Sequence, residues 1–504
     1  MSVHSNSLLS PALWAVLLPL AAACLSLLYG RLPRRGRFLL LGTTPVASAL
    51  FAAILVRGVL AGSSHEIRLV RLMPDVYLSL RVDAAGALFG LSVAVLWSFI
   101  FVFSVGYLRD DRYAGRYHTF SMLCLAGLMG VAYAGDLITF LAFYELFSIM
   151  SYALIVHEGT SSAIAAARKY IVYIAAGGSL LVMGGALAFS ASGAADFAAG
   201  GVLGPGTPPT TATGAALLLI AGFGVKAALF PLHGWVADAH PAAPAPFSAA
   251  LSGVMVAAGT FGIVRVVYEV VGARWLAVLA IDRGLAAVAA FTAISAAVVA
   301  IKQDDLKRRL AYSTVSQMAY ITLGASLLAP GPLTGALVHI TNHASMKGCL
   351  FLCAGLLARN AGITRVSQMG GIARRFPVTM AAFTLSALAL IGIPPLAGFV
   401  SKWVLGYGML DAGAGGYLVV LLGGAALAAV YLLPVVRIAY LGEPSEEREG
   451  SLAPARPGNE AAPSMLAPIV ALTAITALLG IAAFADGSAL SLARLAAESL
   501  AGSR

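Results

Sequence analysis

The sequence predicts an all-α membrane protein of about 14 transmembrane helices. The chain is 60% hydrophobic and only 11% charged, whereas about a quarter of the residues in soluble domains are charged. Its mean hydropathy is +0.90, and apolar stretches of bilayer-spanning length recur along the whole chain. A net charge of +10 would suggest nucleic-acid binding in a soluble protein, but in a membrane protein it fits an excess of cations in cytoplasmic loops.

The apolar segments define the predicted helices in order. Positive charge follows the first segment instead of preceding it, so we expect a membrane helix there and not a cleaved signal peptide. The predicted spans are 9–30, 38–57, 84–107, 118–134, 137–156, 169–190, 213–231, 246–268, 284–301, 310–328, 333–357, 378–407, 416–437 and 464–485.

Cations distinguish the two sides of the membrane. Loops that follow odd-numbered segments carry more than twice as many Lys and Arg residues as the other loops and the termini. Because Lys and Arg concentrate in cytoplasmic loops, we expect both termini to lie outside the cytoplasm. The membrane in which the protein is expected is the cell (inner) membrane. The polar stretch 441–463, rich in Glu, Pro and Gly, is expected to be a cytoplasmic loop.

Two predicted helices contain internal breaks. The seventh reads GFGVKAALFPLHGW and the twelfth reads GIPPLAGFVSKW. Prolines are common in membrane helices, but paired breaks in two halves of a transporter indicate an ion path between inverted repeats. The breaks lie five helices apart, which predicts two inverted five-helix repeats. The predicted units are 1–117 (three helices), 118–270 (first repeat), 271–440 (second repeat), 441–463 (loop) and 464–504 (last helix and short tail).

Lysine is rare and unusually placed. Of only six lysines, three lie inside apolar stretches: Lys226, Lys347 and Lys402. A buried lysine can lose its proton and an arginine cannot, so this distribution predicts proton transport. Glu145 is the only carboxylate deep inside a predicted helix and would pair naturally with Lys226, either as a proton-loading pair or as a static salt bridge that locks two helices; Asp136 lies near a helix end.

Histidines accompany the second of these lysines. His339, His343 and Lys347 are spaced i, i+4, i+8 and share one helical face, which favours a proton relay. Two histidines at this spacing also suit zinc, but no third ligand follows nearby and there is no HExxH, so no metal is expected. His233 and His240 follow the first helix break and are candidates for proton uptake or ordinary interfacial groups.

No motif for nucleotide binding or redox chemistry is found. The chain has no GxxxxGK[ST], no dinucleotide fingerprint, no CxxC and no nucleophile elbow, and its four cysteines are expected to be small core residues. We therefore expect no cofactor and no catalytic redox site in this chain. It would be at most the proton-pumping subunit of a redox-driven translocase, with the driving reaction in a partner.

Several segments together resemble one family. FGVKAALFPLHGWVADAHPAAPAPFSAALSG, DLITFLAFYELFSIMSYALI, QDDLKRRLAYSTVSQMAYITLG, HITNHASMKGCLFL and GIPPLAGFVSKW resemble the antiporter-like subunits of respiratory complex I, group 4 membrane-bound hydrogenases and Mrp sodium/proton antiporters. The resemblance extends from about Val82 to Tyr440 and is closest to the branch that holds the D-type Mrp subunits and the hydrogenase subunits. It implies fourteen helices with two inverted five-helix repeats, each with a broken helix.

The resemblance also implies a role for each buried ionisable residue. Glu145 and Lys226 match the first proton-loading pair, and Lys402 matches the terminal site. Lys347, with His339 and His343, matches the central relay.

One position departs from the family pattern. Many relatives place a lysine where this chain has Ala257, after LSGVMV. The relay therefore lacks a side chain between Lys226 and Lys347. We hypothesise a hydrated gap beside Ala257, flanked by Ser252, Thr260, His339 and His343, because waters persist in an interior only where polar groups hold them.

The function expected from the sequence is proton translocation in a multi-subunit energy-converting complex of complex I or hydrogenase type. One alternative is a D-type component of an Mrp sodium/proton antiporter. Another is a non-conducting membrane scaffold, which only Ala257 favours. The expected partners are other membrane subunits with a redox or antiporter module, protons or sodium, and the lipid bilayer, but no nucleic acid.

Overall fold

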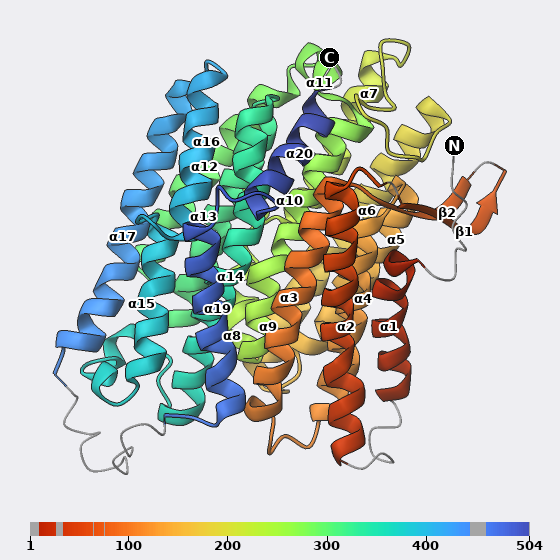
Figure 1. Ribbon diagram of the computed structural model, residues 1–504. Helices are drawn as coiled ribbons and strands as arrows, with labels where there is room; N and C mark the ends of the chain where they lie inside the picture. Colours follow the sequence, from red (N-terminus) through yellow and green to blue (C-terminus); the bar gives the residue numbers. More distant parts are fainter. Residues whose placement is uncertain (1–9, 27–33, 64, 75, 444–459, 503–504) are drawn as a thin grey trace.

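The computed structural model describes residues 10–26, 34–63, 65–74, 76–443 and 460–502, and shows one bundle of long helices (Figure 1). Most of the predicted loop 441–463 lies outside these residues. The N-terminal part of the bundle comprises α1 (Pro11–Ser26), α2 (Arg34–Leu60), α3 (Ala84–Tyr107), α4 (Ala114–Tyr133), α5 (Leu137–Ile155) and α6 (Ser161–Ser192).

The middle of the chain is built from shorter helices. It contains α7 (Pro209–Lys226), α8 (Val236–Ala242), α9 (Ala245–Ala250), the π-helix η2 (Leu251–Met255), α10 (Val256–Arg265), the π-helix η3 (Val266–Val270) and α11 (Ala273–Val278). From α9 to η3 the helical backbone is continuous, and every residue from Ala245 to Val270 is buried. This stretch is therefore the most enclosed of the predicted spans.

The C-terminal part surrounds one long buried helix, α14. Its elements are α12 (Ile281–Ile301), α13 (Leu306–Ser326), α14 (Pro330–Ala361), the 3₁₀ turns η4 (Val366–Gln368), η5 (Ile372–Arg374) and η6 (Gly415–Tyr417), α15 (Pro377–Ile391), α16 (Ala397–Asp411), α17 (Leu418–Leu441), α19 (Pro463–Ile481) and α20 (Ala489–Ala501). In Figure 1, α1, α2, α4, α5 and α6 form one flank and α12, α13, α15, α16 and α17 the other, with α3, α10 and α14 between them.

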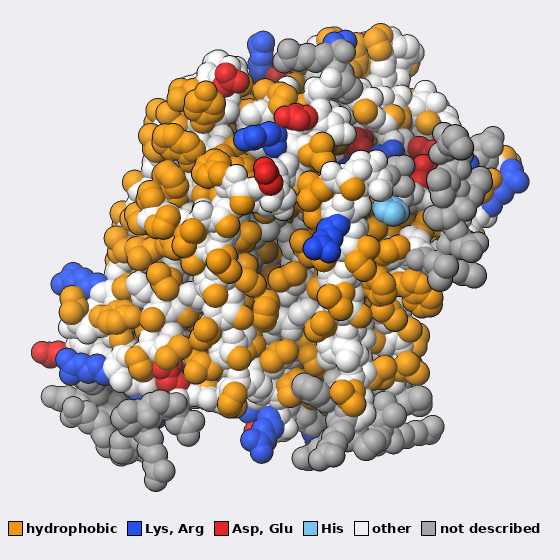
Figure 2. Space-filling model, viewed as in Figure 1, with side chains coloured by type: hydrophobic (Ala, Val, Ile, Leu, Met, Phe, Trp, Pro, Cys, Tyr) orange, Lys and Arg blue, Asp and Glu red, His pale blue; other side chains and the backbone are white. Residues whose placement is uncertain are grey.

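Helices lie over each predicted apolar segment, although their ends differ by several residues. Among the described residues, eight helices are long and apolar enough to cross a membrane, and α1 and α15 are shorter apolar helices. Hydrophobic side chains cover most of the flank in Figure 2, and charged side chains gather toward its two ends. A lipid-facing band between two polar ends is the arrangement of a membrane protein.

Several elements were not predicted. The strands β1 (His65–Met73) and β2 (Val76–Val82) form an antiparallel hairpin between α2 and α3. The short helix α11 precedes α12, and α20, in the predicted tail, packs its apolar residues against α14 and α3. Cys24 is exposed while Cys124, Cys349 and Cys353 are buried, so the expectation of a core cysteine was wrong for Cys24.

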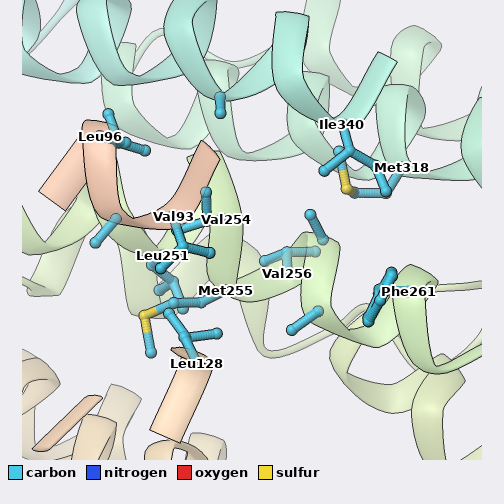
Figure 3. Packing of buried hydrophobic residues seen from close by; sticks show 14 of the residues in the cluster. Val93, Leu96, Leu128, Leu251, Val254, Met255, Val256, Phe261, Met318 and Ile340 are labelled. Atoms are coloured by element: carbon cyan, nitrogen blue, oxygen red, sulfur yellow. The ribbon is translucent and has the colours of Figure 1, made fainter. Parts of the chain in front are cut away.

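The core joins the two halves of the bundle. Figure 3 shows side chains of η2 and α10 packed among residues of α3, α4, α13 and α14. The labelled members are Val93, Leu96, Leu128, Leu251, Val254, Met255, Val256, Phe261, Met318 and Ile340. This apolar layer holds α10 between α7, which carries Lys226, and α13, beside Lys347.

Candidate functional site

The first break comes directly after Lys226. The sequence suggested that the helix would continue to Pro231, but α7 ends at Lys226 and Ala228 has a left-handed backbone conformation, φ 59°. Trp235 Nε1 donates a hydrogen bond of 2.8 Å to the carbonyl of Val225, one of the helix-end carbonyls that lack an intrahelical partner. Lys226 is thus held at the end of a helix inside the bundle.

Lys226 is enclosed by aromatic side chains. Its Nζ donates a hydrogen bond of 2.7 Å to the hydroxyl of Tyr170, which in turn donates 2.8 Å to the carbonyl of Ser148 on α5. The same Nζ lies 4.8 Å, 5.0 Å and 5.7 Å from the ring centroids of Phe147, Tyr170 and Trp235. Ring faces attract a cation, so this site accommodates an ammonium without a carboxylate.

Glu145 does not pair with Lys226. No ion pair joins the two residues within the described part of the chain, so a static salt bridge between them is not formed. The half-buried carboxylate faces α6, where a Cβ built on Gly178 would lie 2.7 Å from Glu145 Oε1. It also lines a mostly apolar cavity of about 380 Å³ between α5 and α6.

At the second break, Lys402 caps the end of the preceding helix. The helix α15 ends at Ile391, α16 begins at Ala397, and Lys402 Nζ donates hydrogen bonds of 2.6 Å and 3.0 Å to the carbonyls of Leu390 and Ile391. A cation at the C-terminus of a helix complements its macrodipole. At the other end of α15, the Glu460 carboxylate accepts hydrogen bonds from the backbone N–H groups of residues 378 and 379, at 2.6 Å and 3.0 Å.

Helix α14 brings the predicted histidine face next to Lys402. His339 Nδ1 is 2.8 Å from the hydroxyl of Ser401, the residue before Lys402. The ring centroids of His339 and His343 are 5.9 Å apart, and both rings are fully buried. The two rings therefore lie close together along α14, at the i, i+4 spacing noted in the sequence.

Lys347 is hydrogen-bonded to α13. Its Nζ donates 2.9 Å to the carbonyl of Leu310 and 2.7 Å to the hydroxyl of Ser313. The hydroxyl of Tyr431 on α17 donates to the same Ser313 oxygen, at 2.9 Å. Lys347 is fully buried, and the atoms that accept its hydrogen bonds are neutral oxygens, as is the single acceptor of Lys226.

A hydrogen-bonded link joins η2 to Lys347. The hydroxyls of Ser252 and Thr314 are 2.6 Å apart, and Thr314 donates 3.0 Å to the Leu310 carbonyl that also binds Lys347. Ala257 is itself fully buried, and its carbonyl accepts a hydrogen bond of 2.8 Å from Thr260. The hydrated gap at Ala257 stays a prediction.

The remaining predicted residues have different surroundings. Asp136 is buried at the N-cap of α5, where it accepts hydrogen bonds from Thr139 and Ser79, which is a structural role. His233 is half-buried in the turn after the first break. His240 in α8 is fully buried, stacks on Phe351 at 4.8 Å and has no hydrogen-bond partner on either ring nitrogen within the described residues.

The sequence did not predict a buried charge network at the opposite end of α10. Arg265 Nη1 lies 2.5 Å from Asp83 Oδ2 and 2.5 Å from Glu269 Oε2, and Arg81 Nη2 lies 2.9 Å from Glu269 Oε1. The i, i+4 spacing of Arg265 and Glu269 inside an apolar stretch was a usable signal. The partners from β2 and the start of α3 are far away in sequence and could not be inferred.

Comparison with known proteins identifies the class. Residues 134–428 match the family described as NADH:quinone oxidoreductase/Mrp antiporter, TM, which is more than half of the chain. The protein therefore belongs to this family of antiporter-like, multi-pass membrane subunits.

Individual relatives come from different complexes. The chain is 37% identical over 379 residues to NADH-quinone oxidoreductase subunit N of Desulforudis audaxviator, covering 74% of this chain and 75% of that protein. It is 26% identical to the D-type Na(+)/H(+) antiporter subunit of Bacillus subtilis, over 92% of this chain and 93% of that one. A chain of the Mrp complex from Dietzia sp. has the same fold, with a TM-score of 0.84, 24% identity and 97% of each chain covered.

Proposed function

We propose that this chain translocates protons as one subunit of a multi-subunit, energy-converting membrane complex. The observation that carries the proposal is the environment of the three buried lysines. Lys226, Lys347 and Lys402 donate only to phenol, hydroxyl or carbonyl oxygens, and none forms an ion pair within the described part of the chain. A permanently charged ammonium without a carboxylate partner is costly to bury, whereas a lysine that exchanges a proton is not held charged.

Observed contacts support parts of the proposed relay. Glu145 and Lys226 load the proton on the α5–α7 side, and Ser252 and Thr314 bridge toward Lys347 in place of the missing side chain at Ala257. The second part passes along one face of α14 and ends at the other helix break. Its members are Lys347, His343, His339, Ser401 and Lys402.

We also propose the arrangement of helices and repeats that the sequence predicts. Residues 118–270 and 271–440 would form two inverted five-helix repeats among fourteen membrane helices, supported by one broken helix in each unit. Both termini would lie outside the cytoplasm, and the cation-rich loops inside it.

The test uses the native complex. The complex would be purified through a tag on this chain, its other subunits identified by mass spectrometry, and proton translocation driven by the partner's reaction measured in vesicles. We expect Lys226→Ala and Lys347→Ala to abolish translocation while the complex still assembles. Normal translocation in both variants would reject the proton-relay function and favour a non-conducting scaffold.

A second candidate is a component of an Mrp-type sodium/proton antiporter. The near full-length match to a D-type Na(+)/H(+) antiporter subunit supports it. In that case the purified complex would contain small membrane subunits and no redox module. Sodium-dependent proton exchange in vesicles, without an electron donor, would favour this candidate over the redox-driven one.

A further inference from the structure

A polar pocket lies at the cation-rich end of the bundle. Its volume is about 310 Å³, and it lies between the end of α3, the turn after α5, the α8–α9 junction and the end of α14. Asp111, His157, Glu158 and Arg359 supply its polar side chains, and Pro244 forms part of its wall. In the proposed orientation this pocket faces the cytoplasm.

The carboxylate of Asp111 is kept charged in this pocket. Burial is the largest single influence and raises the pKa of Asp111. The hydrogen bond of 2.9 Å to His157 Nε2, the backbone hydrogen bond from Tyr113 and the nearby charge of Arg116 together outweigh burial, so the pKa lies below its ordinary value. Glu158 is exposed at the rim. Two carboxylates in an otherwise basic surface attract protons and cations to the pocket.

Lys307 lies directly behind the pocket wall. Its Nζ donates a hydrogen bond of 2.9 Å to the carbonyl of Ala243, the residue before Pro244. Burial lowers the pKa of Lys307 to about 8, although the nearby charges of Glu158 and Asp305 oppose the shift. This amine precedes the predicted span 310–328 and exchanges protons close to neutral pH.

The backbone carbonyl that binds Lys347 lies one helical turn from Lys307 along α13. Lys347 is bonded to the carbonyl of Leu310, three residues further along α13, which is about 4.5 Å along the helix axis. His240 interacts electrostatically with both Lys307 and Lys347. Its ring stacks on Phe351, one turn from Lys347 on α14, and neither of its nitrogens has a partner within the described residues.

We propose that this pocket is the proton-uptake site of the chain, with Lys307 as the residue that receives the proton and His240 as the residue that passes it to Lys347. The neutral amine of Lys307 binds a proton from water and gives it to one ring nitrogen of His240. The other ring nitrogen releases a proton to the amine of Lys347, and Lys307 returns to the neutral state. The proton comes from a hydronium ion, whose O–H bond breaks to leave water, and every later step exchanges one N–H bond for another. The proposal rests on the proposed function.

The experiment compares three single variants in the native complex in vesicles. Lys307→Gln removes the titrating group. Lys307→Arg keeps the charge and a donor for the Ala243 carbonyl but cannot release a proton. Lys302→Gln, an exposed lysine in the same loop region, is the matched control. We expect both Lys307 variants to slow proton translocation about a hundredfold, the lower range for a positioned acid or base, and Lys302→Gln to be unchanged.

The outcomes separate this inference from the proposed function. Normal translocation in Lys307→Gln, while Lys347→Ala is inactive, would overturn the uptake route and leave the relay standing. Normal translocation in Lys307→Arg would show that only charge is required and would also overturn it. If Lys307→Gln fails to assemble, Lys307→Arg decides alone. Activity in Lys347→Ala would reject both proposals.

Discussion

At the scale of single residues, the buried lysines are distinguished by the atoms that accept their hydrogen bonds. Lys226 donates to a phenol, Lys347 to a carbonyl and a hydroxyl, and Lys402 to two carbonyls. Each of these oxygens can accept from an ammonium or from a neutral amine. The surroundings therefore allow both protonation states without rearrangement of the site.

Tyr170 offers a direct test of this arrangement. Tyr170→Phe removes the acceptor of Lys226 and the donor to Ser148 but keeps the ring. We expect it to destabilise the complex by about 1–3 kcal/mol, because buried Lys226 loses its hydrogen-bond acceptor, and to slow proton translocation. Thermal unfolding and vesicle assays would measure the two effects.

The control is Tyr144→Phe. The Tyr144 hydroxyl is buried on α5, close to the same aromatic rings, but has no hydrogen-bond partner in the described structure. Its removal should cost little stability and little activity. Equal losses in the two variants would mean that the Lys226 contact has no special role.

At the scale of helices, the two breaks place lysines at helix ends by different means. Lys226 is itself the last residue of α7, whereas Lys402 reaches from α16 to the end of α15. In the second case the lysine serves both as a helix cap and as a candidate proton carrier. These two roles can be separated by substitution.

Lys402→Arg keeps the positive cap on α15 and removes the ability to release a proton. We expect the variant complex to assemble with normal thermal stability but to lose most proton translocation. Lys402→Met should lose both stability and transport, because the carbonyls of Leu390 and Ile391 lose their donor. Wild-type transport by Lys402→Arg would show that this site needs only a charge.

Close helix contact at the first break depends on Gly259. A Cβ at this position of α10 would lie 2.9 Å from the backbone carbon of Lys226 and closer still to the N–H of Ala227. Gly259→Ala should therefore cost about 1–3 kcal/mol as an overpacking change, and it should move Lys226 away from α10. Melting of the purified complex would detect the loss.

Gly284→Ala is the matched control, because nothing lies within 4 Å of a Cβ built there on α12. Alanine is more favourable than glycine in the interior of a helix, so we expect an unchanged or slightly higher melting temperature. An equal decrease in both variants would argue against a specific contact at Gly259.

The sequence predicted the elements better than the contacts. Apolar runs and proline breaks are local properties, so the helix positions and both interrupted helices could be inferred from them. The hydrogen-bond partner of Lys226 could not be inferred, because Tyr170 lies on a different helix and its sequence context does not distinguish it from other tyrosines. The ion pair between Arg265 and Asp83 could not be predicted either, because the two residues lie on different elements far apart in the sequence. The hairpin of β1 and β2 could have been predicted from the alternation of its residues.

At the scale of the whole molecule, the cation asymmetry predicts the orientation of the bundle. In intact cells with Cys24→Ser, an impermeant maleimide should label Arg68→Cys in the exposed hairpin and should not label Lys302→Cys. After lysis, both should react. The three remaining cysteines are buried and provide a low background. Labelling of Lys302→Cys in intact cells would contradict the orientation.

Helix α15 carries opposite charges at its two ends, Glu460 at the first N–H groups and Lys402 at the last carbonyls. Each charge complements the partial charge that aligned peptide groups leave there, and each contributes about 0.3–1 kcal/mol or more when buried. When Lys402 gives up its proton, the negative end of α15 loses its counter-charge and attracts the next proton. The helix dipole therefore favours recharging of Lys402 after every proton that this lysine releases.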